Sequence, residues 1–142
     1  MVWPKWRVEH PLASIGLHLA VAAPFVALAS RFIVNDTNIL HVALNGGEDL
    51  PLKYRFAATW AAREGPLLMW AAWMGLVSWW FARPLASEQE KTHKLRLRLM
   101  YGFTLLLILI SMTLNPFAEN PYNLRGSGLN ELLQTDLMVI HP

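Results

Sequence analysis

The sequence predicts an all-α integral membrane protein with about three transmembrane helices and a short interfacial helix. Apolar residues make up 54% of the 142 residues and only 15% are charged, whereas about a quarter of a soluble domain is charged. Three apolar runs each approach the roughly 20 residues that a helix needs to cross a bilayer. Because a chain of this length forms at most one modest domain, we expect residues 1–142 to form a single membrane domain.

The three predicted spans cover residues 11–34, 66–82 and 97–114. The first contains His18 well inside the apolar run, and Pro24, which we expect to kink the helix. A bilayer tolerates such a break where neighbouring helices or water satisfy the released carbonyl. The third run is apolar on every side, which is not the pattern of a surface helix.

Three spans place the two ends of the chain on opposite sides of the membrane, and the basic residues indicate which side is which. One side carries seven Lys and Arg residues, near the N-terminus and in the short loop at 83–98. The other side carries five, spread over more chain and mixed with seven acidic residues. We therefore expect the loop at 35–65 and the tail at 115–142 to face outward, to the periplasm or the intermembrane space.

The outward loop is expected to contain a short interfacial helix from Tyr54 to Arg63. Gly65 and Pro66 would break this helix and begin the second span, because proline suits the first turn of a helix. Glu64 then lies beside the N-terminus of the second span, where negative charge is favourable.

Tryptophan is abundant, with seven residues in the chain. On an ideal helix Trp70, Trp73 and Trp80 form a stripe about 80° wide, while Trp79 points the opposite way. Such a stripe is typical of helix packing and of anchoring at the membrane interface. The alternative interpretation is an aromatic wall beside a flat macrocycle.

Several functional classes are excluded by composition. The chain has no cysteine, so disulfides, thiolate ligands and a cysteine nucleophile are impossible. There is no Gly-rich phosphate loop and no zinc-type Cys/His array. The net charge of +2 is too small to indicate nucleic-acid binding.

His141 is the main candidate for a functional residue. It follows an apolar segment in the predicted outward tail and is the second-to-last residue of the sequence. Neutral imidazole is a common ligand of haem iron and of other metals. The alternative interpretation is a capping or surface histidine.

The other histidines are assigned ordinary roles. His18 lies mid-span, and we expect a neutral imidazole that is hydrogen-bonded to a neighbouring helix, although ionisable residues at that depth are often functional. His10, His41 and His93 lie outside the apolar runs and are expected to be solvated.

Three basic residues lie in the predicted outward loop, near Trp60. Because guanidinium groups bind carboxylates in a bidentate fork, Arg55, Arg63 and Lys53 could bind haem propionates or an acidic partner. The alternatives are snorkelling to lipid headgroups and pairing with Glu64.

Four segments, in this order, resemble the CcmF family, the membrane haem lyase of the System I cytochrome c maturation machinery. They are residues 34–36, residues 50–70 (Leu-Pro-Leu-Lys-Tyr-Arg-Phe-Ala-Ala-Thr-Trp-Ala-Ala-Arg-Glu-Gly-Pro-Leu-Leu-Met-Trp), Asn115-Pro116-Phe117, and the closing segment at 129–142. The family pattern after Trp60 reads Trp-Gly-x-His-Glu-Gly-Ser, and here Ala61, Arg63 and Pro66 replace the Gly, His and Ser. The resemblance covers the early part of the family's sequence and implies the N-terminal portion of a split CcmF.

The resemblance implies a role for His141. In the family, the corresponding histidine is one of two outward-facing histidines that flank a tryptophan-rich WWD segment and ligate incoming haem. The resemblance thus makes His141 an axial ligand of haem iron, with haem b shared between this chain and a partner chain that carries the WWD segment. It gives no such role to His18, because the transmembrane haem ligands of the family lie beyond residue 142. No catalytic residue is expected in this chain.

The resemblance also implies partners and location. A lyase of this family accepts haem from a CcmE-type chaperone and attaches it to apocytochrome c with a CcmH-type subunit. Splitting of the family favours the mitochondrial inner membrane, with a bacterial inner membrane as the alternative. The rival function is a structural or assembly subunit of an inner-membrane respiratory complex, derived from CcmF but without haem handling.

Overall fold

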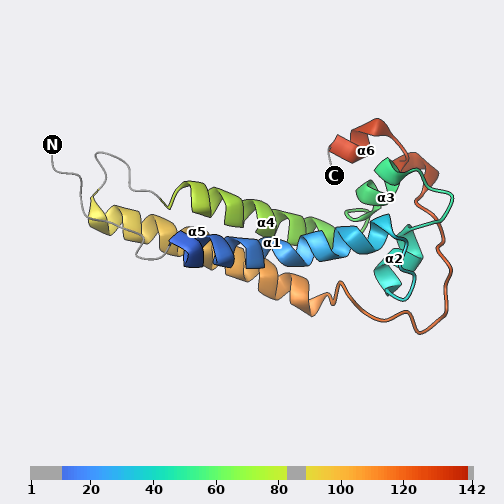
Figure 1. Ribbon diagram of the computed structural model, residues 1–142, viewed down its shortest axis with the longest axis horizontal. Coiled ribbons are helices and arrows are strands. Elements are labelled where there is room, and N and C mark those ends of the chain that lie inside the picture. The colour runs from blue at the N-terminus through green and yellow to red at the C-terminus, as the bar shows by residue number, and fades with distance from the viewer. Residues whose placement is uncertain (1–10, 83–88, 141–142) are drawn as a thin grey trace.

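The computed structural model describes residues 11–82 and 89–140. In chain order its elements are α1 (Pro11–Ile33), α2 (Leu40–Asn45), α3 (Leu52–Ala58), α4 (Glu64–Trp80), α5 (Glu90–Thr113), the 3₁₀ turn η1 (Glu131–Leu133) and α6 (Asp136–Ile140). The long helices α1, α4 and α5 run alongside one another, and the short helices gather at one end of them (Figure 1). The described residues form no strand beyond one isolated bridge, between Ile39 and Glu119. The predicted all-α fold class is confirmed.

Two of the long helices have the length and apolarity of membrane spans. These are α1, over Gly16–Ile33, and α5, over Glu90–Thr113, and only 17% of each apolar window is buried. Apolar side chains that are left uncovered in this way are expected to face lipid or partner helices. The third helix, α4, has 17 residues, the lower limit for a span, so its crossing of the membrane remains a prediction.

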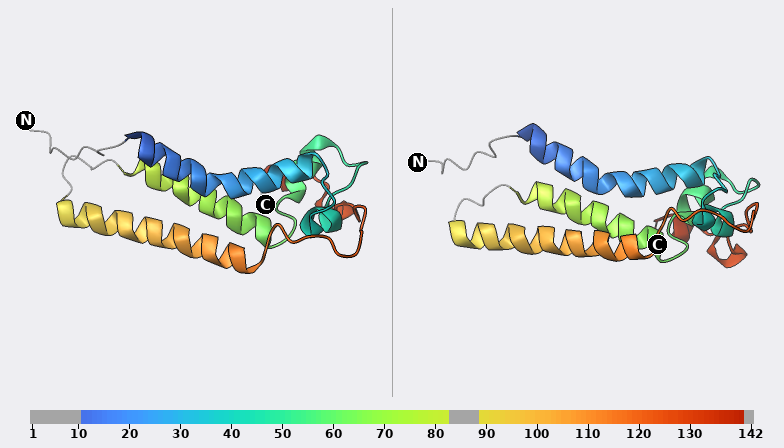
Figure 2. Two further views of the ribbon diagram at one scale, coloured as in Figure 1. Left: turned by 60° about the horizontal axis from the view of Figure 1, so that its bottom comes forward. Right: turned by 90° about the horizontal axis from the view of Figure 1, so that it is seen from below.

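Small residues let the long helices approach one another. α4 packs against both α1 and α5, and its Ala71, Gly75 and Ser78 are buried. A Cβ added to Gly75 would lie 2.9 Å from Val21 Cγ1 on α1. Close approach at small residues is the usual way in which membrane helices pack. Pro24 lies inside α1, and Figure 2 shows that this helix is bent along its length, as expected.

The end of the bundle is covered by residues 35–63 and 115–140, which we call the cap. Backbone hydrogen bonds join its two halves, from Leu40 N–H to Ala118 O (2.8 Å) and from Ser127 N–H to Ala43 O (3.0 Å). Both predicted outward segments therefore lie at the same end of the bundle, opposite the start of α5 (Figure 2). Which side of the membrane this end faces remains a prediction.

An apolar core ties the cap to the bundle. It consists of Leu28, Phe32, Val42, Leu50, Ala58, Leu68 and Leu129, drawn from α1, α2, α3, α4 and the C-terminal segment. Arg55 fixes the adjoining loop, because its guanidinium donates to the carbonyls of Ile33 (3.2 Å), Leu50 (2.9 Å) and Glu48. The Ile33 carbonyl ends α1, where a cation is favourable.

The interfacial helix is shorter than expected. The predicted helix from Tyr54 to Arg63 is α3, which ends at Ala58 and continues as tight turns, with Trp60 N–H donating to Ala57 O at 3.1 Å. The reason is the close packing of the start of α4, since a Cβ added to Gly65 would lie 1.6 Å from Thr59 O. The chain must reverse sharply here, and only glycine leaves room for it.

We therefore predict that Gly65→Ala destabilises the fold by about 3 kcal/mol or more, the upper range for overpacking a close contact. The measurement is thermal unfolding in nanodiscs, followed by circular dichroism. Gly102→Ala on α5 is the matched control: a Cβ there meets nothing within 4 Å, so it should shift stability by at most about 1 kcal/mol. Equal melting of the two variants would contradict the packing described.

Candidate functional site

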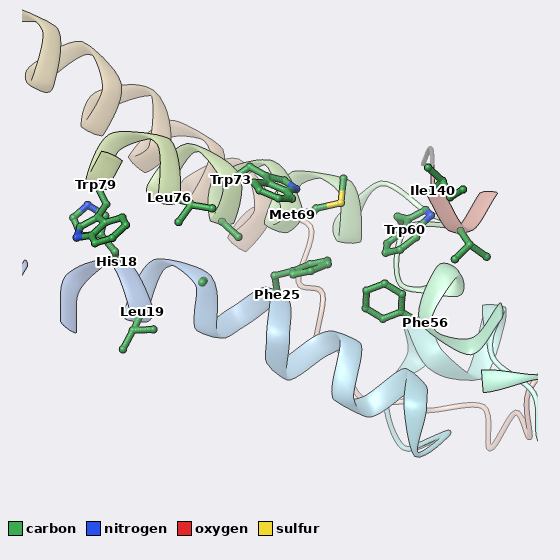
Figure 3. A pocket seen from close by; sticks show the side chains of 13 residues that line it. His18, Leu19, Phe25, Phe56, Trp60, Met69, Trp73, Leu76, Trp79 and Ile140 are labelled. Carbon is green, nitrogen blue, oxygen red and sulfur yellow. The ribbon is translucent and has the colours of Figure 1, made fainter. Parts of the chain in front are cut away.

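A cavity of about 700 Å³ lies between α1 and α4 and is bounded at the cap by α3 and α6. We call it the groove. Its lining is almost entirely apolar and consists of His18, Leu19, Ala22, Phe25, Phe56, Trp60, Met69, Ala72, Trp73, Leu76, Trp79, Val139 and Ile140. Figure 3 shows His18 and Trp79 at one end, and Phe56, Trp60 and Ile140 at the other.

Three tryptophans contribute to the aromatic part of this lining, but they are not the set that the alternative interpretation of the stripe named. Trp73 and Trp79 of α4 line the groove together with Trp60, whereas Trp70 and Trp80 are exposed and lie outside it. The alternative interpretation, one aromatic wall formed by Trp70, Trp73 and Trp80, is therefore wrong, and anchoring of these exposed side chains at the membrane interface stays a prediction. Helical spacing gives the angles between side chains but not the position of the neighbouring helix, so Trp79 was missed.

The short helix α6 is held against the groove by two polar contacts. Trp60 Nε1–H donates to the carbonyl of Met138 at 2.8 Å, and Lys53 Nζ lies 2.5 Å from Asp136 Oδ1. The bond to Asp136 raises the pKa of Lys53, but such an exposed pair contributes little to stability. The indole bond is therefore the main polar attachment of α6.

His141 lies outside the described residues. The residue bonded to it, Ile140, lines the groove, as does Val139. Ile140 is nevertheless 81% exposed, so it lies at the open edge of the groove. The residue that directly precedes His141 therefore lies at the mouth of an aromatic cavity.

Of the three basic residues near Trp60, two are bonded to other groups of this chain. Arg55 binds three backbone carbonyls, and Lys53 pairs with Asp136. Arg63 is exposed. Sequence alone could not show that Arg55 serves the backbone, because carbonyl acceptors carry no sequence signature.

Two histidines expected to be solvated are buried. His41 is 7% exposed because α2 packs its ring edge-on against Phe32, with ring centroids 5.0 Å apart. His93 is 9% exposed, and its Nδ1 lies 3.0 Å from Arg96 Nη2. His10 lies outside the described residues, and His18 has the expected helix partner, with its Nε2 3.4 Å from the Tyr101 hydroxyl on α5.

His41 is the best-connected buried polar group of the cap. Its Nε2 lies 3.3 Å from the Thr59 carbonyl, and its Nδ1 lies 3.5 Å from Asn45 Nδ2 and 3.9 Å from Glu64 Oε2. Burial lowers the pKa of His41, although the Thr59 bond and the Glu64 charge act in the opposite direction. Because the carbonyl can only accept, Nε2 carries a proton, and Nδ1 accepts from Asn45 in the neutral ring.

No group of three or more potential metal ligands occurs within residues 11–82 and 89–140. The iron-ligand role of His141 stays a prediction, because this residue lies outside the described residues.

Comparison with known proteins identifies the family. No family model and no solved structure matches the chain. It is 37% identical to the cytochrome c-type biogenesis protein CcmF of Escherichia coli over 99% of this chain, and 34% identical to CcmF of Pseudomonas aeruginosa over 97%. The chain belongs to the CcmF family. It is also 27% identical, over 87% of its length, to the cytochrome c-type biogenesis protein NrfE of Haemophilus influenzae.

The homology confirms the resemblance drawn from the four sequence segments. The chain spans about a quarter of the length of the curated CcmF proteins that it matches, 24% of the Escherichia coli protein and 22% of the Pseudomonas aeruginosa protein.

We predict that Trp60→Phe loosens α6 while keeping the aromatic lining. Losing one hydrogen bond of about 1 kcal/mol should make opening of α6 about fivefold more frequent. The measurement is hydrogen exchange at the amides of Met138 to Ile140. Trp80→Phe is the matched control, since Trp80 is exposed and outside the groove. Unchanged exchange in Trp60→Phe would contradict the role of the indole bond.

A second prediction concerns acid. Because the pKa of His41 is lowered from 6.5 on folding, the unfolded chain binds its proton more readily. Stability from this group is present above about pH 6.5 and is lost as the pH falls through the folded pKa. Unfolding midpoints measured from pH 7.5 to 5 should fall for the natural chain and fall less for His41→Gln. Parallel curves for both would show that His41 is not the group responsible.

Proposed function

We propose that this chain forms part of a cytochrome c haem lyase and helps to bind haem b for attachment to apocytochrome c. The proposal rests on membership of the CcmF family and on one structural observation. The helix α6, held by the Trp60 indole, brings residues 139–140 to the mouth of an aromatic groove. The following residue, His141, is proposed as an axial ligand of the haem iron.

The groove fits one face of a flat apolar macrocycle. Its volume of about 700 Å³ falls within the range of about 300–1,000 Å³ that is typical of ligand sites. Tryptophan rings offer stacking surfaces, and the apolar walls keep water from the bound ring. The neutral imidazole of His141 would supply one bond to iron, and the family resemblance assigns the second ligand to the part of CcmF that carries the WWD segment.

The covalent chemistry belongs to the substrates. The haem vinyl groups would be joined to the thiols of a Cys-x-x-Cys-His segment in apocytochrome c. This chain has no cysteine, so its proposed part is to hold and orient haem. The remaining length of a CcmF, with its WWD segment, would complete the site.

The proposed partners follow from the family. They are the part of CcmF that carries the WWD segment, a CcmE-type haem chaperone, a CcmH-type subunit and apocytochrome c. The proposed location is the mitochondrial inner membrane, or alternatively a bacterial inner membrane, with the cap in the intermembrane space or periplasm.

One observation favours a second candidate, a structural subunit derived from CcmF. Arg55 and Lys53, the cations that could bind haem propionates, are both engaged within the chain. In this alternative the groove would hold only protein or lipid.

The test is the haem content of the purified membrane complex. We predict that His141→Ala lowers its haem affinity roughly tenfold or more, in the range found for disrupted metal sites, and that His141→Gly regains haem when imidazole is added. His10→Ala, on the other side of the predicted first span, is the matched control. Unchanged haem in His141→Ala, with a normal assembly, would overturn the lyase proposal in favour of the structural subunit.

A further inference from the structure

The buried carbonyl of Thr59 connects two contacts that lie on different parts of the cap. Thr59 is fully buried, and its carbonyl accepts from His41 Nε2–H at 3.3 Å. The next residue, Trp60, begins with the amide nitrogen of that same peptide group and donates its indole N–H to Met138 of α6. A single peptide unit therefore joins the imidazole of α2 to the side chain that holds α6.

The imidazole of His41 is also held by contacts other than its hydrogen bond to Thr59. Phe32 of α1 packs against it at an interplanar angle of 84°, and Asn45 lies beside Nδ1. Glu64 Oε2, 3.9 Å from Nδ1, is buried without a hydrogen-bond partner. A ring that is held by neighbours from α1, α2 and α4 can set the direction of the Thr59 carbonyl accurately.

The Trp60 side has little freedom of its own. Its ring lies edge-on to Phe56, with centroids 4.9 Å apart at 88°, and the peptide that it shares with Thr59 faces Gly65 too closely for any side chain there. Because the Thr59 carbonyl group and the Trp60 Cα both lie against Gly65, a shift of this peptide would carry the Trp60 Cα, and with it the indole nitrogen, relative to Met138.

We propose that His41 is a positioning residue of the groove, and that its hydrogen bond to the Thr59 carbonyl fixes the Trp60 indole and, through Met138, the helix α6 that carries the chain to His141. The structural part of this inference stands without haem. Its consequence for haem binding rests on the proposed function.

The experiment measures the position of α6 by electron spin resonance between two labels on the full chain in nanodiscs. Because the chain has no cysteine, Leu52→Cys and Leu137→Cys can be labelled selectively, and both positions are exposed. His41→Leu removes the donor at similar volume, whereas His41→Gln keeps an N–H group that can reach the carbonyl. In His41→Leu we expect a second, longer distance between the two labels, with a population about fivefold higher than in the natural chain. His41→Gln should give a distance distribution close to that of the natural chain.

A double-mutant cycle distinguishes the proposed coupling between His41 and the Trp60–Met138 hydrogen bond from a general loss of packing. Once Trp60→Phe has cut the link to Met138, adding His41→Leu should not displace α6 further, because coupled residues are non-additive. Labels at Val26→Cys and Leu105→Cys, exposed positions on α1 and α5, report whether the bundle itself is intact. Additive displacement by the two substitutions, or equal displacement by His41→Leu and His41→Gln, would overturn the proposal.

Haem binding distinguishes this inference from the proposed function. If His41→Leu displaces α6 and also weakens haem binding, both stand. If it displaces α6 while neither His41→Leu nor His141→Ala changes the haem content, the positioning role stands and the lyase proposal fails. If α6 keeps its position in His41→Leu, the positioning role fails whatever the haem content.

Discussion

The indole N–H of Trp60 joins the C-terminal helix to the rest of the molecule. It donates to the carbonyl of Met138 at 2.8 Å across 78 positions of the sequence. This hydrogen bond depends on a second feature, the sharp reversal at Thr59 and Gly65. The reversal turns the indole N–H of Trp60 toward α6, while the ring still packs against Phe56 of α3. A glycine without room for a Cβ and a buried carbonyl bonded to His41 hold this reversal in place. The functional interpretation of His141 depends on this small set of contacts.

The bundle and the cap are held together by different forces. In the bundle, buried small residues such as Gly75 and Ser78 allow α4 to approach its neighbours. Only 17% of the apolar window of α1, and of that of α5, is buried, which suits helices surrounded by lipid. In the cap, Arg55, Asn120 and Trp60 satisfy backbone carbonyls directly. The groove lies where these two regions meet, with apolar walls from the bundle and a polar attachment at its edge.

The parts of the fold that the sequence predicted depend on local pattern. The apolar runs indicated α1, α4 and α5, and Gly65 with Pro66 indicated the start of α4. The parts that it missed depend on contacts between distant residues. The burial of His41 comes from Phe32 on another helix, the early end of α3 comes from close packing of Thr59 on Gly65, and the place of Trp79 in the groove comes from α1. Of the site, the sequence indicated His141 by resemblance, but it could not show that Trp60 holds the segment leading to it.

The central claim is that α6 lies at the mouth of the groove in a native membrane. Cysteine cross-linking between Phe56→Cys and Ile140→Cys tests it most directly, because both positions line the groove and no other cysteine is present. The account predicts rapid intramolecular cross-linking of the two cysteines by a flexible bismaleimide that can span the groove. Failure to cross-link, while both cysteines still react with a monofunctional maleimide, would contradict it.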